Sequence, residues 1–205
     1  MQKKYAGLVL LIVFFVATLA AAPAWAQRLD RMPVIAPGTV YNWQTESGPM
    51  TDTVVGPHEI RRVWGKNQKI LDISLTSDGN VVKFVWGWTV TDEYAPFYPF
   101  FNFTVPMSVG RTWEDGFTSK KTGQAYTARH LVETYESVRL ADNKTVVDAF
   151  KLTSALTRTS DGAKFTETVW LSPQLGLIKY LSADFKIDRT VVNVAVPSGA
   201  RVAAR

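Results

Sequence analysis

Apolar and polar residues alternate with a period of two along most of the chain, which is the pattern of β-strands that bury one face. The segment Lys69–Thr76 is a clear example, because Leu71, Ile73 and Leu75 fall on one side and Asp72, Ser74 and Thr76 on the other. The segment Asn80–Val90 carries large apolar residues at every second position, which are Val82, Phe84, Trp86, Trp88 and Val90. We expect Asn80–Val90 to be one strand, with Phe84, Trp86 and Trp88 in the protein core.

Turn residues separate several further strand candidates. Ser-Asp-Gly sequences at 77–79 and 160–162 predict tight hairpins, because glycine adopts positive φ without steric cost. The segment Gln124–Val138 is long and rich in threonine, tyrosine and valine, which favours a strand with a β-bulge. The remaining candidates are Gly38–Thr45, His58–Trp64, Arg111–Thr118, Val146–Thr159, Ala163–Ser172, Leu177–Ser182 and Phe185–Val196.

About ten short strands with no convincing helix predict an all-β fold. Their regular spacing is typical of an antiparallel sandwich or a barrel-like curved sheet. One segment interrupts the rhythm. Thr91–Val109 contains Pro96, Pro99 and Pro106 and is too long for a hairpin connection, so we expect it to be a loop that crosses between sheets.

The first 26 residues have the three-part layout of a secretory signal peptide. Lys3 and Lys4 precede the uncharged apolar run Ala6–Ala22, and Ala24-Trp25-Ala26 supplies the small residues of a cleavage site. The alternative is an uncleaved membrane anchor, but the run is at the short end of bilayer-spanning lengths. We therefore expect cleavage before Gln27, no membrane span afterwards, and export to the bacterial periplasm.

Cleavage would leave three parts: an N-terminal lead at 27–37, a single β domain at 38–196 and a disordered tail at 197–205. It would also remove two lysines, so the net charge of +5 falls to +3. With no Lys/Arg-rich run, that charge predicts no nucleic-acid partner. The chain has no cysteine, which excludes disulfides, thiolate-bound metals and thiol catalysis.

Other catalytic or metal-binding chemistry has little support in the sequence. His58 and His130 could meet beside glutamates around a metal ion, but nothing in their spacing requires it, and each is expected to be an ordinary surface or half-buried strand residue. The neighbouring carboxylates Asp92-Glu93 and Glu114-Asp115 would point to opposite faces of a strand. We therefore expect no catalytic residue, no metal site and no cofactor, while a glycosidase-like carboxylate pair from distant strands stays open.

Aromatic residues are concentrated between Phe84 and Phe103, where nine of them lie. Six fall in the expected proline-rich loop, and four of these are our candidate ligand-binding residues: Tyr94, Phe97, Tyr98 and Phe101. Exposed together, they would form a larger apolar patch than a monomer normally shows. We interpret them as a groove for an apolar, amphiphilic or glycan ligand, or for an envelope protein. The alternative is that they belong to the core.

Two motifs resemble those of a family of uncharacterised exported bacterial proteins, a domain of unknown function. The first is a Pro-x-x-Val-Gly-x-x-Trp strand start at Pro106–Trp113, and the second is a Trp-x-Ser-Pro-x-Leu-Gly-Leu-x-Lys-Tyr hairpin at Trp170–Tyr180. The resemblance covers roughly Phe100–Tyr180. It implies export and a β fold, and it implies no activity.

These observations predict an exported β domain of the bacterial envelope with a binding or structural role rather than an enzymatic one. The alternative is a cell-envelope hydrolase that uses carboxylates from separate strands. A binding module should have a preformed apolar groove and no carboxyl group with a strongly shifted pKa, whereas an enzyme should gather acidic side chains in a cleft. A third option, a hollow barrel that carries lipid, is disfavoured by six bulky tryptophans beyond Trp25.

Overall fold

The computed structural model describes residues 28–65, 67–87 and 89–198. Within these ranges the chain consists of strands, turns and irregular connections. The expected signal peptide at 1–26, the side chain of Trp88 and most of the expected tail at 197–205 lie outside the described residues.

No helix in the described part of the chain is long and apolar enough to cross a membrane.

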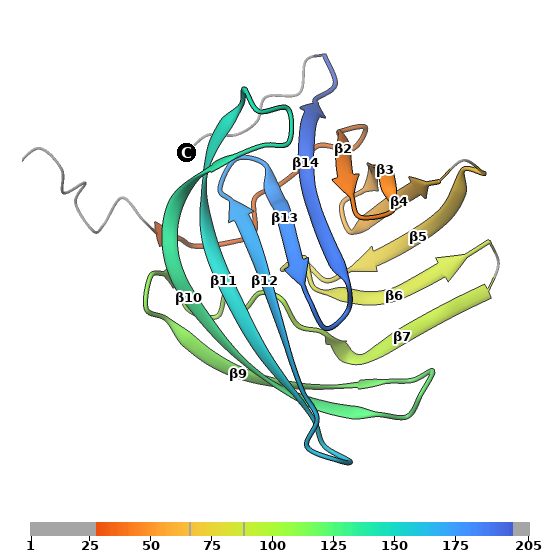
Figure 1. Ribbon diagram of the computed structural model, residues 1–205, viewed down its shortest axis with the longest axis vertical. Helices are drawn as coiled ribbons and strands as arrows, with labels where there is room; N and C mark the ends of the chain where they lie inside the picture. Colours follow the sequence, from red (N-terminus) through yellow and green to blue (C-terminus); the bar gives the residue numbers. More distant parts are fainter. Residues whose placement is uncertain (1–27, 66, 88, 199–205) are drawn as a thin grey trace, which may run out of the picture.

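Twelve antiparallel strands close into one barrel (Figure 1), which confirms the expected all-β, barrel-like sheet. In their order around the barrel, the strands are β10 (Ala125–Arg139), β11 (Val146–Arg158), β12 (Lys164–Ser172), β13 (Gly176–Ser182), β14 (Ile187–Ala195), β2 (Val40–Thr45), β3 (Gly48–Gly56), β4 (Glu59–Trp64), β5 (Lys69–Leu75), β6 (Val81–Trp86), β7 (Thr89–Tyr98) and β9 (Thr112–Ser119). Two short strands, β1 (Arg28–Leu29) and β8 (Met107–Ser108), pair with each other.

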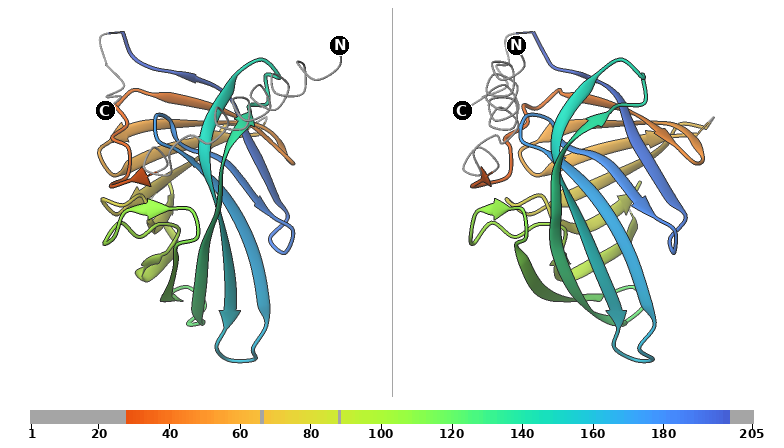
Figure 2. Two further views of the ribbon diagram at one scale, coloured as in Figure 1. Left: turned by 90° about the vertical axis from the view of Figure 1, so that its left-hand side faces the viewer. Right: turned by 60° about the vertical axis from the view of Figure 1, so that its left-hand side comes forward.

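The barrel has two walls whose strands run in different directions. Figures 1 and 2 show the long strands β10, β11 and β12 forming one wall, while β2–β7 are stacked across the other. Strands β13 and β14 join the walls on one side, and β9 joins β7 to β10 on the other. Closure of this kind pairs the edges that an open sheet would expose.

Local turn and bulge chemistry agrees with the sequence-based expectation. Gly79 and Gly162 adopt φ values of +80° and +69° at the two predicted hairpin turns. The long strand β10 pairs with β11 along its whole length, with a register shift between Val132 and Thr134. That shift confirms the predicted bulge.

The prediction of a loop over Thr91–Val109 is wrong for the first half of that segment. The prediction of a single strand over Asn80–Val90 is also wrong. The chain reverses at Gly87, which has φ of +60°, and returns as β7 beside β6. Pro96 fits in β7 because the pairing with β6 jumps from Glu93 to Tyr98, so no regular ladder needs a proline N–H there. The sequence did not predict strand β3, because the charged residue Asp52 occupies one of the buried positions where an apolar residue is expected.

Several buried clusters make up the packed core of the described chain. The inner faces of β10, β11 and β12 are covered by the chain between β7 and β9, through Phe100, Phe101 and Met107. Their partners include Val132, Phe150 and Leu152, all of which have no exposed surface. A second cluster packs along β2, β3, β13 and β14, through Trp43, Met50 and Val191. Together the clusters do not fill the space between β2–β7 and β13–β14, where the site described below lies.

Replacement of Phe150 by alanine should show how much this core contributes. Phe150 is completely buried, with its ring centroid 4.7 Å from that of Tyr135. We expect Phe150→Ala to lower the free energy of unfolding by about 3–5 kcal/mol. Val146→Ala on the same strand should change it by about 0.5 kcal/mol or less, because Val146 is 51% exposed. Urea unfolding of both variants measures this, and equal losses would contradict the assigned core.

Candidate functional site

The barrel holds a cavity of about 1000 Å³. Its walls come from β2–β7, β13 and β14, together with the segment 32–37 and Phe100-Phe101. The lining side chains occupy alternate strand positions, as the inner face of a barrel requires; on β5 they are Leu71, Ile73 and Leu75. Most of the lining is aliphatic or aromatic, and the volume lies at the upper end of small-molecule binding sites.

Three of the four predicted ligand-binding residues reach this cavity. Tyr94 and Tyr98 project from β7 with ring centroids 5.2 Å apart, and Phe101 lies beside them, 2% exposed. Phe97 is half-buried on the same strand and is not part of the lining. The expected position of the aromatic cluster on a surface loop is wrong, because β7 is a barrel strand whose inner face carries the two tyrosines.

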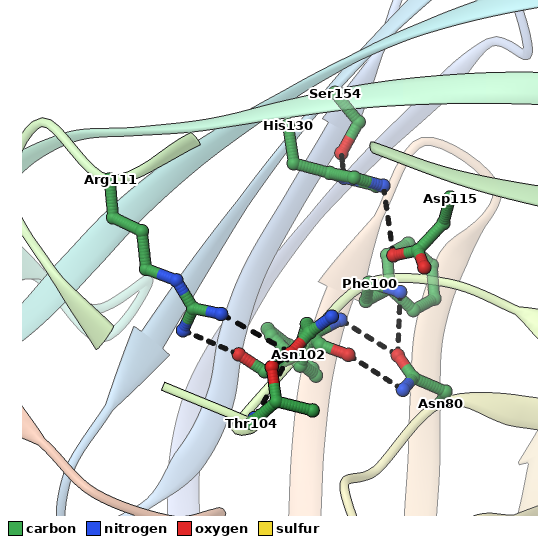
Figure 3. A network of polar contacts seen from close by, with 9 residues as sticks. Asn80, Phe100, Asn102, Thr104, Arg111, Asp115, His130 and Ser154 are labelled. Carbon is green, nitrogen blue, oxygen red and sulfur yellow. Dashed lines mark hydrogen bonds and ion pairs between the residues drawn. The ribbon is translucent and has the colours of Figure 1, made fainter. Parts of the chain in front are cut away.

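Asn80 holds the aromatic wall in place and was not recognised from the sequence. Its side-chain oxygen accepts hydrogen bonds from the backbone N–H groups of Phe100 and Phe101 at 2.6 and 2.7 Å, and its amide donates to the Phe101 carbonyl at 2.7 Å (Figure 3). Asn80 is 1% exposed, so these bonds satisfy polar groups shielded from water. The sequence indicated only a turn residue here, because its partners lie about 20 positions away.

The five tryptophans in the described part of the chain do not fill the barrel, contrary to expectation. Trp43 and Trp64 lie along the cavity wall, and Trp86, expected in the core, is 44% exposed while still lining the cavity. Trp113 stacks against His130, and the ring of Trp170 faces two lysines. Phe84, also expected in the core, is only half-buried and lines the cavity as well. A barrel wider than eight strands has more interior than its inward side chains fill.

A buried ion pair forms part of the cavity wall. Arg62 on β4 and Asp52 on β3 are directly opposed in the sheet register. The guanidinium Nε and Nη2 each donate to one oxygen of Asp52 at 2.8 Å. The Asp52 side chain is only 4% exposed, and two-point contact of this kind satisfies both charges in a site that excludes water.

A second arginine faces the same cavity without such a partner. Arg189 on β14 lines the cavity, and its Nε is buried with no hydrogen-bond acceptor among the described residues. Burial lowers the pKa of Arg189, and the charge of Arg62 lowers it further, against the opposing effects of Glu46, Tyr180 and Asp52. Of the two arginines in the cavity wall, Arg62 is therefore paired with a carboxylate, whereas the Nε of Arg189 has no acceptor.

Glu167 lies behind two tyrosines of the cavity wall. It is 1% exposed on β12, and its Oε1 accepts a hydrogen bond from the Tyr98 hydroxyl at 2.7 Å. Its Oε2 accepts a second bond from the Tyr180 hydroxyl. Burial raises the pKa of Glu167 to about 7, while the two hydroxyls act in the opposite direction. Both carboxyl oxygens are thus engaged by protein donors.

His130, Ser154 and Asp115 form a buried polar cluster elsewhere in the barrel (Figure 3). Ser154 Oγ lies 2.8 Å from His130 Nδ1, and Asp115 Oδ2 lies 3.8 Å from Nε2. The residue types are those of a serine nucleophile relay. However, Ser154 is 2% exposed, His130 has no exposed surface, and neither lines the cavity. Burial lowers the pKa of His130 to about 4, so the imidazole is neutral near pH 7.

The histidines and neighbouring carboxylates do not assemble into a site. His58 is exposed at the β3–β4 turn as expected, whereas the expectation for His130 is wrong because it is completely buried. Asp92 accepts a hydrogen bond from Ser119 Oγ at 2.9 Å, while Glu93 pairs with a lysine on the other side of the strand. Glu114 similarly faces away from Asp115 and lies 3.9 Å from an exposed arginine.

No protein-family model matches the sequence, and no curated protein matches it. Solved structures that align with the chain include the hypothetical lipoprotein YmcC from Escherichia coli, with a TM-score of 0.49 and 10% identity over 83% of this chain and 93% of that one. A predicted exported protein of Bacteroides fragilis with a YmcC-like fold gives 0.40 and 12%, over 80% and 99% of the two chains. A predicted lipoprotein of Parabacteroides distasonis gives 0.38 and 10%, over 80% and 99%. Similarity at this level assigns no function to the chain.

The raised pKa of Glu167 should make stability fall as the pH rises. Its folded-state pKa of about 7 exceeds the ordinary 4.5, so between these values the folded protein keeps a proton that the unfolded chain has lost. We expect the wild type to lose roughly 3 kcal/mol relative to Glu167→Gln between pH 4.5 and pH 8. Urea unfolding across this pH range measures the difference in free energy of unfolding between the two proteins. Both contain His130, so its titration does not affect this difference.

Glu114→Gln is the matched control, because the Glu114 side chain is 77% exposed. The difference in free energy of unfolding between Glu114→Gln and the wild type should be the same at every pH. A constant difference between the wild type and Glu167→Gln would show that Glu167 ionises as an ordinary surface carboxyl group.

Proposed function

We propose that this protein is an exported, non-enzymatic binding protein of the bacterial envelope that holds an apolar or amphiphilic ligand inside its barrel. The observation that carries the proposal is the cavity of about 1000 Å³ with largely apolar walls. Placing apolar ligand surface there would remove it from water, which is favourable by roughly 25 cal/mol for each Å².

The aromatic end of the cavity supplies the proposed ligand contacts. We assign this role to Tyr94, Tyr98 and Phe101, which line the cavity. The two tyrosines are half-buried, whereas Phe101 is 2% exposed and offers only a small part of its ring. Phe97 is left out of the assignment because its side chain does not line the cavity. Asn80 supports the site indirectly, by fixing the backbone that carries Phe101.

Binding is favoured over hydrolysis by the state of the acidic groups. A carboxylate-dependent hydrolase needs two acidic side chains with free oxygens on either side of the reacting bond. Of the acidic side chains in the described cavity lining, Asp52 is held by Arg62, and Glu59 is exposed at the start of β4. Behind the wall, the oxygens of Glu167 accept bonds from Tyr98 and Tyr180. The raised pKa of Glu167 follows from burial rather than from a second acid beside it.

Export is supported by the pattern of residues 1–26, with its positive start, apolar run and Ala-Trp-Ala end. The periplasm is an aqueous compartment between two membranes, in which an apolar molecule requires shielding from water. An apolar cavity inside the barrel would provide that shielding, whereas a net charge of +3 after cleavage offers no basic surface for a nucleic acid.

Two neighbouring residues of β5 allow a matched test of the cavity. Leu71 lines the cavity, whereas Ile70 points outward and is 47% exposed. We expect the wild type to increase the fluorescence of 1-N-phenylnaphthylamine on binding, Leu71→Trp to weaken its affinity at least tenfold by occupying the cavity, and Ile70→Trp to leave it unchanged.

Far-UV circular dichroism and thermal unfolding would establish that both variants are folded. Absence of probe binding to the wild type would overturn the proposed function. Equal affinity of Leu71→Trp and Ile70→Trp would place the bound probe outside the barrel.

A further inference from the structure

We propose that the ligand carries an anionic head group, a carboxylate or a phosphate, and that Arg189 binds this group inside the cavity. The inference rests on the proposed function and adds the chemical class of the ligand. It is carried by the unpaired guanidinium of Arg189 in an otherwise largely apolar wall.

Arg189 has hydrogen-bonding capacity that the protein leaves unused. A guanidinium carries five N–H donors and no acceptor. The Nε of Arg189 is buried without a partner, and none of the ion pairs within the described residues involves this arginine. Removing a cation from water without pairing it is costly, so a site of this kind gains from an anion that supplies the missing acceptors.

The acceptors near Arg189 make other contacts, and within the described residues none is hydrogen-bonded to its side chain. Both oxygens of Asp52 accept bonds from Arg62, and Glu46 Oε2 accepts from the backbone N–H of Asp188 at 3.1 Å. Tyr180, which is paired with Arg189 in the sheet register, donates its hydroxyl proton to Glu167. A bound anion would therefore complete the coordination of Arg189 without breaking these contacts.

The direction of the cavity fits a ligand with one charged end. Arg189 and Arg62 lie on β14 and β4, on the part of the wall formed by β14 and β2–β4. Arg62 is paired with Leu71 on β5, and Leu71, Ile73 and Phe84 all line the cavity. A head group on Arg189 would thus leave the apolar body of the ligand to extend toward β5–β7 and the aromatic wall.

Charge also discriminates between ligand classes. Two arginines and one aspartate lie at this part of the wall, so a cationic head would be repelled, and a neutral head would leave the charge of Arg189 unpaired. The other charged residues of the lining, Glu59 and Lys121, lie in or next to the turns that follow β3 and β9, and are exposed. The surplus positive charge therefore lies with Arg189.

The test measures how well oleate, 1-oleoyl-lysophosphatidate and oleyl alcohol displace bound 1-N-phenylnaphthylamine. From the wild type, we expect at least one of the two anionic lipids to displace the probe at a concentration about tenfold lower than oleyl alcohol. Whether oleate or lysophosphatidate is the stronger competitor distinguishes a carboxylate head from a phosphate head. Inorganic phosphate without an acyl chain should compete far more weakly than either anionic lipid.

Arg189→Gln should abolish this preference for anions and leave displacement by oleyl alcohol unchanged, which also shows that the variant is folded. Arg189→Lys keeps the charge and should keep part of the preference. Arg129→Gln is the matched control, because the Arg129 side chain is 73% exposed on β10 and is not part of the cavity lining. This control should behave as the wild type does.

Equal displacement by anionic and neutral lipids, or an unchanged preference in Arg189→Gln, would overturn the role of Arg189 while leaving the proposed cavity function intact. If Arg189→Gln does not fold, loss of all anion preference in a folded Arg189→Lys would overturn it equally. Failure of the probe and all three lipids to bind the wild type would overturn the proposed function, and this inference with it.

Discussion

Closure of twelve strands into one barrel is the constraint on which the rest of the structure depends. Such a barrel has a wide interior, and an interior without a core would cost the stability that apolar burial provides. The chain between β7 and β9 meets this need on one side, where Phe100, Phe101 and Met107 pack against β10–β12. A second buried cluster packs along β2, β3, β13 and β14, and the space that the clusters leave becomes the cavity, so core and candidate site are two parts of the same interior.

Polar groups inside this interior are satisfied to different degrees. Asp52 and Arg62 neutralise each other, and Glu167 is covered by two tyrosine hydroxyls. His130 shares a short contact with Ser154 and lies in the packed side, away from the cavity. His130 Nε2 and Arg189 Nε are both buried without a hydrogen-bond partner, but of these two residues Arg189 is the one that lines the cavity. That difference separates polar groups that support the fold from one suited to bind a ligand.

The candidate site could be predicted from the sequence only where local composition marks it. The density of aromatic residues singled out Tyr94, Tyr98 and Phe101, all of which reach the cavity, although their surroundings were misjudged. Arg62, Arg189 and Glu167 could not be found, because each is a single charged residue in an ordinary strand pattern and their neighbours come from distant segments. Proline also misled the interpretation of β7, since its effect depends on whether the neighbouring strand needs that N–H.

Alternation, turn glycines and the bulge in β10 depend on residues close together in the chain, and these determined the all-β class and most strand positions from the sequence alone. Closure of the barrel depends instead on contacts between remote segments, such as β14 with β2 and β7 with β9. Only the tertiary structure decided that inward side chains would surround a cavity rather than meet in a sandwich core. The physical reason is that a period of two specifies which side of a strand is buried, but not how far away the opposite wall lies.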